Sequence, residues 1–433
     1  MLHWIERKFH LSVRRTSLRQ ELVGGLTTFA TMAYIIVVNP LMLQEAGLNF
    51  SSVMFATILT AAFATLCMAL IANYPFALAP GVSMAAYFTY SVCLGQKVPW
   101  ETALGVVFFA GIALFVLWAF RLRELIIAAI PKALQLGTTA GLGLFLVLIG
   151  LKNGKVIVSH PETLMALGNL SSPETLLSLL GVLVISVLMA LRVQGAILIG
   201  ILANWILGLI FGLSAWKGVV SWPNFATDTF GALHYSAVFQ EGIWMIMLSF
   251  IFISLFDTAG SLLGLSHQGH FLDKQGNLPR LRRALLPDAL GTIAGSLSGT
   301  SSTAVYIESA AGIASGARTG LSMIFVSLCF LACLFFGPLA SSIPLFSITP
   351  VLVVIGSLML RACVHIDWED PTEFIPAFMT LIAIPFTFNI GTGIGIGMIF
   401  YPLCKTFAGR WRDVHWFAWV LAVLFGLKLI YQP

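Results

Sequence analysis

The sequence predicts an all-α polytopic membrane protein with one integral domain, residues 1–433. Hydrophobic residues make up 58% of the chain and charged residues only 9%. Apolar runs such as residues 108–120, 176–191 and 324–336 recur along the whole length. A helix of about 20 apolar residues crosses a bilayer, and no polar segment between the runs is long enough to bury a soluble core. We therefore expect short loops and no cleavable targeting peptide.

The apolar runs divide into about fourteen spans. The basic, amphipathic start, residues 1–20, predicts a helix that lies on the cytoplasmic membrane surface before the first span. A further apolar run at 414–431 either crosses the membrane or lies at its surface. The spans are expected to begin near Leu22, Val53, Ala77, Thr102, Leu125, Leu176, Ala196, Gly242, Leu281, Thr303, Thr319, Ile343, Phe374 and Gly391.

Loop charges give the orientation. When the loops are numbered by the span that they follow, the odd loops hold only Lys97, Lys152, Lys155 and Lys217. The even loops hold Arg121, Arg123, Arg192, Lys274, Arg280, Arg282, Arg283, Arg318, Arg361, Lys405, Arg410 and Arg412. Basic loops stay on the cytoplasmic side of a membrane, so we expect a cytoplasmic N-terminus in a bacterial inner membrane. The net charge of +5 reflects this topology and indicates no nucleic-acid partner.

Two spans are unusual, and they occupy corresponding places in the two halves of the chain. The third, residues 76–90 (FALAPGVSMAAYFTY), and the tenth, residues 299–312 (GTSSTAVYIESAAG), are both short and rich in small residues. Such pairs indicate inverted repeats, here residues 21–214 and 241–407 with seven spans each. We expect each of the two spans to contain an extended segment before a half-helix, with unpaired backbone N–H groups that line a binding site. Small residues elsewhere, such as residues 391–397, are interpreted as close helix packing.

Three acidic residues fall within apolar segments, namely Asp257, Asp288 and Glu308. An ionised acid at the bilayer centre costs at least ~2.5 kcal/mol, so each is a functional candidate. Helical spacing puts Asp257 on one small, polar stripe with Ser254 and Ser261, which predicts that this face looks inward to a site. Asp288 lies near the predicted cytoplasmic end of its span, where either a functional role or a structural one is open. The structural role would be a helix cap or an ion pair with Arg282 or Arg283.

The same segments carry a family resemblance. Residues 27–43 (TTFATMAYIIVVNPLML), 78–90 (LAPGVSMAAYFTY), 253–265 (ISLFDTAGSLLGL) and 299–322 (GTSSTAVYIESAAGIASGARTGLS) resemble the signature segments of AzgA-like purine permeases, in the nucleobase:cation symporter-2 (xanthine/uracil permease) superfamily. The resemblance runs nearly end to end. It implies a seven-plus-seven inverted repeat with a core domain and a gate domain. Members take up adenine, guanine or hypoxanthine, typically with a proton.

Site residues follow from this resemblance. It implies that Asp257 and Glu308 flank the base. Our own hypothesis is that one of them carries the coupled proton while the other holds the base, and we favour Asp257 as the carrier. The carboxylates can accept from ring N–H donors of a purine, while backbone N–H groups serve its ring nitrogens. Ala85 stands where the family usually has an asparagine, and Ser254 where a second acid is often found. The remaining residues that we expect beside the base are Ala86, Ile307, Ser261 and the aromatic residues Phe29 and Tyr87.

The sequence therefore predicts a secondary active transporter that imports purine nucleobases by proton symport, without a cofactor. The alternative within the same fold is a transporter of uracil, xanthine or another small anion. A channel or an intramembrane enzyme is a weaker alternative, because no catalytic motif such as HExxH or GxSxG occurs. The expected partners are the purine substrate and membrane lipid, and a homodimer is compatible with the sequence. The six scattered cysteines have no metal-ligand spacing.

Overall fold

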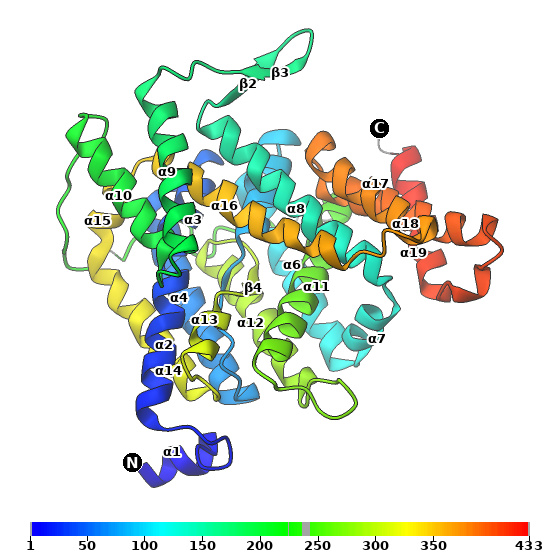
Figure 1. Cartoon of the computed structure of the whole chain (residues 1–433), viewed down its shortest axis with the longest axis horizontal. Helices are drawn as coiled ribbons and strands as arrows, with labels where there is room; N and C mark the ends of the chain where they lie inside the picture. The colour runs from blue at the N-terminus through cyan, green and yellow to red at the C-terminus, as the bar shows by residue number, and fades with distance from the viewer. Residues whose placement is uncertain (1, 224, 236–242, 432–433) are drawn as a thin grey trace.

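Long helices dominate the computed structural model of the chain, which describes residues 2–223, 225–235 and 243–431 (Figure 1). The predicted starts of the second repeat, residue 241, and of the eighth span, Gly242, lie outside the described residues. The α-helices are α1 (Leu2–Phe9), α2 (Leu18–Met32), α3 (Ile35–Glu45), α4 (Phe50–Cys67), α5 (Val82–Ala86), α6 (Trp100–Ala119), α7 (Leu122–Ala129), α8 (Lys132–Asn153), α9 (Pro173–Ala190), α10 (Ala196–Ile210), α11 (Ile243–Gln268), α12 (Leu281–Ser298), α13 (Ser309–Ala314), α14 (Leu321–Ala332), α15 (Gly337–Ser342), α16 (Thr349–Leu360), α17 (Pro371–Thr387), α18 (Ile390–Phe407) and α19 (Trp416–Tyr431). The other elements are the π-helices η1 (Met68–Ala72) and η2 (Tyr87–Gly95), the 3-10 turns η4 (Cys333–Phe336), η5 (Leu345–Ser347), η6 (Arg361–His365) and η7 (Trp411–Asp413), and the strands β1 (Leu78–Pro80), β2 (Ile157–His160), β3 (Leu164–Leu167) and β4 (Thr303–Val305).

Nine helical segments in the described part of the chain are long and apolar enough to cross a membrane. Shorter apolar helices accompany them, as expected of spans that are broken or tilted. The nine segments are Leu18–Glu45, Phe50–Ala72, Trp100–Ala119, Lys132–Asn153, Pro173–Ala190, Ile243–Gln268, Leu321–Ser342, Leu345–His365 and Ile390–Phe407. The shorter helices are Val82–Gly95, Ala196–Ile210, Pro371–Thr387 and Trp416–Leu427. The chain is thus an integral membrane protein.

Several helices begin at caps that the local sequence supplies. At the start of α2, the side chain of Ser17 accepts from the backbone N–H of Gln20, and the Gln20 side chain accepts from the backbone N–H of Ser17. Asn49 and Asn389 cap α4 and α18 in a similar way through their Oδ1 atoms. Each cap gives a partner to backbone N–H groups that have none inside the helix. The starts of these three helices are therefore determined by neighbouring residues.

Strands β1 and β4 come from distant parts of the chain and lie side by side in the interior. They pair antiparallel, with Ala79 opposite Ala304, and every residue of both strands is buried. Helix α5 follows β1, and helix α13 follows β4. The strands fall within the two unusual short spans of the sequence. Their pairing gives each strand hydrogen-bond partners that lipid could not provide.

The helices pack in two groups. The first bundle contains α2 to α6 and α11 to α15 with the β1–β4 pair, and the second bundle contains α8 to α10 and α16 to α19. Helix α7 connects α6 of the first bundle to α8 of the second and contacts both α11 and α19. Contacts between the bundles are made mainly by α11, which touches α18 and α8, by α5, which touches α8, and by α2, which touches α10. The two bundles therefore meet along α11, the helix that carries Asp257.

Glycine allows close approach of helices in the second bundle. A Cβ added at Gly397 would lie 1.8 Å from the Thr380 hydroxyl, and one at Gly137 would lie 2.5 Å from the Ala377 carbonyl oxygen. Gly143 meets Gly356 in the same way, at 2.6 Å from its carbonyl oxygen. Small residues let helix backbones approach in membranes, where water does not drive association. The glycines in residues 391–397 thus serve helix packing, as the sequence predicts.

Two of the basic residues assigned to loops are in fact buried. The side chain of Arg123, on α7, is fully buried and pairs with Asp288. Lys405, on α18, is 1% exposed, and its Nζ lies 2.7 Å from the carboxylate of Glu373. The prediction that these two residues lie in loops is wrong, because a nearby acid in the fold compensates each charge. The remaining basic residues still supply the loop-charge asymmetry.

Candidate functional site

Glu308 lies where β4 gives way to α13, at the centre of the first bundle. The hydroxyl of Tyr34, at the start of α3, donates to its carboxylate oxygen Oε1 over 2.6 Å. The hydroxyl of Thr31, on α2, donates to its backbone oxygen over 3.3 Å. The side chain of Glu308 is partly exposed although the residues of the strand before it are buried. A glutamate that is held by one neutral donor and partly open is able to accept further hydrogen bonds from a ligand.

Asp257 occupies the middle of α11. Its Oδ2 accepts a hydrogen bond of 3.3 Å from the hydroxyl of Ser83, on α5. The side chain is partly exposed, whereas its neighbours Phe256 and Thr258 are buried. Helix α11 packs against β4 and α13, the elements on either side of Glu308. The two acids of the eighth and tenth predicted spans therefore lie on elements that contact one another, and together they form the candidate site.

Open space adjoins Asp257 along α11. A Cβ built at Gly260 or at Gly264 would meet no atom within 4 Å. The two glycines follow Asp257 at helical spacing, toward the C-terminal end of α11, which lies on the same side of the molecule as α1 (Figure 1). Both glycines are exposed, so they lie on the surface of the structure. The part of α11 that follows Asp257 is therefore uncovered on this face, toward the side of the molecule that carries α1.

The strand pair fixes the backbone on which the site is built. The hydroxyl of Tyr306 donates to the backbone oxygen of Pro80 over 2.6 Å, and the backbone N–H of Ala77 donates to the hydroxyl of Ser309 over 2.9 Å. These bonds join the start of α5 to the start of α13. The carbonyls of Tyr306, Ile307 and Glu308 accept from the first backbone N–H groups of α13. The prediction of unpaired N–H groups at this half-helix is therefore wrong, because a tight turn already satisfies them.

The other predicted site residues lie in different surroundings. Ala85 and Ala86, on α5, are fully buried, Ser261 is 9% exposed, and Ile307 is 56% exposed beside Glu308. The ring of Phe29 is partly exposed and packs edge-on against Phe330 at 5.3 Å between centroids. The ring of Tyr87 is buried against Phe250 at 4.8 Å. The packing thus leaves Phe29 partly exposed and Ile307 exposed, and makes Tyr87 a core residue.

Sequence reasoning missed the hydroxyl donors that hold the two acids. Tyr34 and Thr31 hold Glu308, and Ser83 holds Asp257. Each of these residues lies in an apolar segment, where a hydroxyl needs a partner. That signal is present in the sequence, but it does not say which acid each hydroxyl reaches.

Asp288, the third candidate, is separate from this accessible site. It is fully buried and pairs with Arg123. The predicted partners Arg282 and Arg283 are therefore wrong for the pair. The guanidinium of Arg282 instead lies over the ring of Trp118, at 5.0 Å from its centroid. Among the described residues, no group of three or more His, Cys, Asp or Glu side chains could hold a metal ion.

The arrangement provides hydrogen-bond acceptors inside a membrane protein. Two carboxylates can accept from N–H donors, and neither has an Arg or Lys partner among the residues that the structure describes. A site of this kind suits a small, flat molecule with several N–H groups better than an anion, which two acids would repel.

Comparison with protein families decides the class of the chain. Residues 19–396 match the model described as the Permease family. The chain belongs to this family. As a member of the Permease family it is a transporter and not an enzyme, and the accessible acids in its interior are candidates for the transport site.

The relatives of this permease extend over almost its whole length. The adenine permease AdeP of Escherichia coli (strain K12) is 39% identical over 427 residues, which are 99% of this chain and 96% of that protein. The guanine/hypoxanthine permease PbuO of Bacillus subtilis (strain 168) is 40% identical over 429 residues, which are 97% of this chain and 99% of that protein. The transmembrane domain of a cyanobacterium bicarbonate transporter, BicA, has a TM-score of 0.64 at 16% identity, over 88% of this chain and 97% of that one. The permease therefore has the fold of that transporter.

Proposed function

We propose that this permease imports purine nucleobases, namely hypoxanthine, guanine or adenine, by proton symport. The observation that carries the proposal is the pair of partly exposed acids, Asp257 and Glu308, inside the membrane without a basic partner among the described residues. Retaining such acids in a membrane is unfavourable unless they act on a ligand or an ion. The names of the relatives, adenine permease and guanine/hypoxanthine permease, supply the class of ligand.

The chemistry of a purine matches the site. A purine presents ring N–H groups and an exocyclic amino or oxo group around a flat aromatic ring. Glu308 accepts two adjacent donors of the base, since its carboxylate has two oxygens and Tyr34 engages one of them. Phe29, which is partly exposed, offers a ring face for stacking. Ala85 is buried and has no polar group, so the backbone of α5 provides contacts that an asparagine would give from its side chain.

We further propose fourteen crossings in two inverted repeats of seven, residues 21–214 and 241–407, with the extra helix α19 after them. Nine long segments, three of the shorter apolar helices, α12 and the β4–α13 segment give fourteen in the part of the chain that is described. Equivalent helices pack alike: α2 on α14 as α11 on α6, α4 on α14 as α12 on α6, and α9 on α10 as α17 on α18. The antiparallel pairing of β1 with β4 supports a two-fold relation between the two interrupted spans. The first bundle is then the core domain and the second the gate domain.

The contacts at the other end of the molecule support an inward-facing state. Tyr90 donates to Glu45 over 2.9 Å, and the side-chain amide of Asn153, at the end of α8, donates to both. The hydroxyl of Ser91 donates to the backbone oxygen of Phe388 over 2.6 Å. Helix α8 leads into the β2–β3 hairpin, which lies opposite α1 in Figure 1. These bonds join the two bundles at that end, while α11 is exposed at Gly260 and Gly264, toward the end that carries α1.

In this scheme Asp257 carries the proton and Glu308 holds the base. Asp257 belongs to the continuous helix α11, which can move as one body, whereas Glu308 lies at the strand–helix junction where the donors of the base converge. A membrane potential of 100 mV contributes ~2.3 kcal/mol per charge moved. At about 1.36 kcal/mol per decade this drives roughly fiftyfold accumulation of a neutral base.

The proposed setting is a bacterial inner membrane with the N-terminus in the cytoplasm. Helix α1 ends with Arg7 and Lys8, and basic residues on the same side include Arg280 and Arg283. Basic segments remain on the cytoplasmic face, so the accessible side of the acids faces the cytoplasm. The outward large apolar side chains, such as Leu183 and Ile206, contact lipid, and a homodimer is compatible with this arrangement.

The test is uptake of radiolabelled hypoxanthine by cells that express the protein and lack their own purine carriers. Unlabelled hypoxanthine, guanine, adenine, xanthine and uracil are added as competitors, with and without a protonophore. We expect hypoxanthine, guanine or adenine to compete, external acid to stimulate uptake, and the protonophore to abolish accumulation. Competition by uracil or xanthine alone would favour the alternative substrate class. Sodium-dependent accumulation that is indifferent to the protonophore would exclude proton symport.

A further inference from the structure

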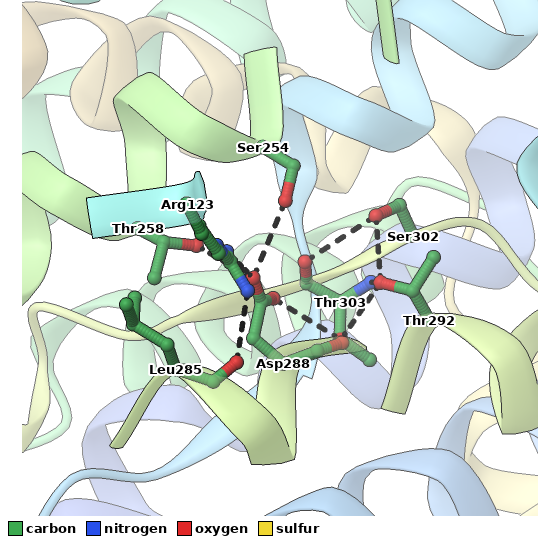
Figure 2. Close-up of polar contacts among 8 residues, drawn as sticks. All are labelled: Arg123, Ser254, Thr258, Leu285, Asp288, Thr292, Ser302 and Thr303. Atoms are coloured by element: carbon green, nitrogen blue, oxygen red, sulfur yellow. Dashed lines mark hydrogen bonds and ion pairs between the residues drawn. The ribbon is translucent and has the colours of Figure 1, made fainter. Parts of the chain in front are cut away.

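A buried ion pair contacts two elements of the proposed transport site, helix α11 and strand β4. Arg123, on α7, and Asp288, on α12, are both fully buried and form an ion pair through Nη2 and Oδ2. The other terminal nitrogen of Arg123, Nη1, donates to the backbone oxygen of Leu285 over 2.8 Å. Figure 2 shows the guanidinium and three hydroxyl groups converging on the Asp288 carboxylate. The charge of Asp288 is therefore compensated inside the protein.

This pair reaches the helix that carries Asp257. The hydroxyl of Thr258, the next residue after Asp257, donates to Asp288 Oδ2 over 2.9 Å, and that of Ser254 donates to the same atom over 3.3 Å. Ser254 and Thr258 are one helical turn apart on α11, so they fix the rotation of this helix about its axis. The rotation decides in which direction Asp257 points.

The pair also reaches the strand that leads to Glu308. The hydroxyl of Thr303, the first residue of β4, donates to the backbone oxygen of Asp288 over 2.9 Å and lies 3.5 Å from its Oδ1. The hydroxyl of Thr292, one turn further along α12, forms hydrogen bonds with those of Ser302 and Thr303 at 3.0 and 3.2 Å (Figure 2). Together these bonds attach β4 to α12, so Asp288 contacts the helix that carries Asp257 and the strand that leads to Glu308.

The surroundings of Asp288 do not suit a proton carrier. Its Oδ2 atom already accepts from Arg123, Ser254 and Thr258, and the side chain has no exposed surface. The carboxylate of Asp288 is thus fully engaged by groups of the protein, in contrast to the partly exposed carboxylate of Asp257.

We propose that Asp288, held by Arg123, is a positioning residue for the transport reaction, which orients Asp257 through Thr258 and Glu308 through Thr303. The inference rests on the proposed function of those two acids. Arg123 also connects Asp288 to α7, the helix between α6 of the first bundle and α8 of the second. The two acids are then aligned before the base arrives, and less ordering is needed when it binds.

The first test removes one hydroxyl at a time and leaves the ion pair in place. Thr258→Val and Thr303→Val keep the side-chain volume but remove the bond to Asp288. We expect each to raise the KM for hypoxanthine uptake about fivefold, the equivalent of one hydrogen bond, with the melting temperature of the purified protein and the maximal rate nearly unchanged. Thr380→Val is the matched control, because this buried threonine of α17 bonds only within its own helix in the described structure. It should leave the KM at the wild-type value.

The second test removes both charges together. Arg123→Met or Asp288→Leu alone leaves a buried unpaired charge and can prevent folding, so the double variant Arg123→Met/Asp288→Leu is the informative protein. We expect it to fold better than either single variant while its KM stays raised. A wild-type KM in the double variant, or in both threonine variants, would overturn the positioning role. If the wild-type protein takes up no hypoxanthine, the proposed function fails instead, and this outcome is seen before any variant is compared.

Discussion

Asp257 and Asp288 are aspartates on neighbouring membrane helices, yet the fold treats them in opposite ways. Asp288 is fully buried, pairs with Arg123 and accepts from the hydroxyls of Ser254 and Thr258. Asp257 is partly exposed, accepts from Ser83, and has no basic partner among the described residues. An acid in a membrane needs either a compensating charge or a ligand. The charge of Asp288 is compensated by Arg123, whereas Asp257 remains available to a ligand or an ion.

The same difference separates Glu308 from the ionic cluster of the second bundle. Lys405 is buried against Glu373, and Asp370 is paired with Arg410 at 2.6 Å. Asp370 lies at the start of α17, outside the membrane interior, and hydrogen bonds from Thr372 and Arg410 lower the pKa of its carboxyl. The carboxylate of Glu308, in contrast, accepts a hydrogen bond from the neutral hydroxyl of Tyr34, and the residue is partly exposed. The acids of the second bundle thus hold helices together through ion pairs, whereas Glu308 has no basic partner among the described residues.

The largest effect is expected at the uncompensated acids. Asp257→Asn should abolish uphill accumulation, a loss of about fiftyfold at 100 mV, while exchange of base across the membrane persists. Glu308→Gln should abolish both, because the base loses its main acceptor. Labelled hypoxanthine uptake and counterflow in vesicles measure the two activities. Glu162→Gln, an exposed acid in the β2–β3 turn, is the control and should behave as wild type. Normal accumulation in both Asp257→Asn and Glu308→Gln would show that the acids without a basic partner are not needed for transport.

An effect on stability rather than on coupling is expected at the compensated acid. Arg123→Met leaves Asp288 buried without its partner, which should lower the free energy of unfolding by about 3–5 kcal/mol. The matched control is Arg410→Met, which breaks an ion pair that is half exposed and should change stability by no more than about 1 kcal/mol. Thermal unfolding of the purified proteins measures the difference. Equal melting temperatures would mean that the buried pair gives no more stability than the exposed one.

The smallest effect is expected from the neutral donor at Glu308. Tyr34→Phe removes the hydroxyl that donates to Oε1 but keeps the ring, so the KM for hypoxanthine should change by about three- to tenfold. Tyr401→Phe removes a comparable bond to Glu373 in the second bundle and should leave the KM unchanged. Concentration dependence of uptake in both variants measures the effect. A similar change of KM in both would show that the tyrosine bond at Glu308 has no specific role.

The sequence alone could predict much of the fold. The apolar runs indicated the membrane spans, because hydrophobicity is a local property of the chain, and the Ser17, Asn49 and Asn389 caps are local as well. Small residues with Pro80, Gly81 and Gly299 predicted extended backbone in the two short spans, where strands β1 and β4 occur. Arg123 and Lys405 could not be placed correctly, since a basic residue beside an apolar run looks the same whether it faces water or a buried acid.

The sequence by itself determined that the chain spans a membrane, that the two halves hold corresponding short spans, and that three acids lie in apolar segments. Only the tertiary structure decided which acid is compensated. Arg123 and Asp288 are 165 residues apart, and Tyr34 and Glu308 are 274 apart. Such pairs depend on how helices pack after the chain has inserted, and no local pattern encodes them. The physical reason is that desolvation acts on each residue alone, whereas charge compensation requires a partner at hydrogen-bond distance.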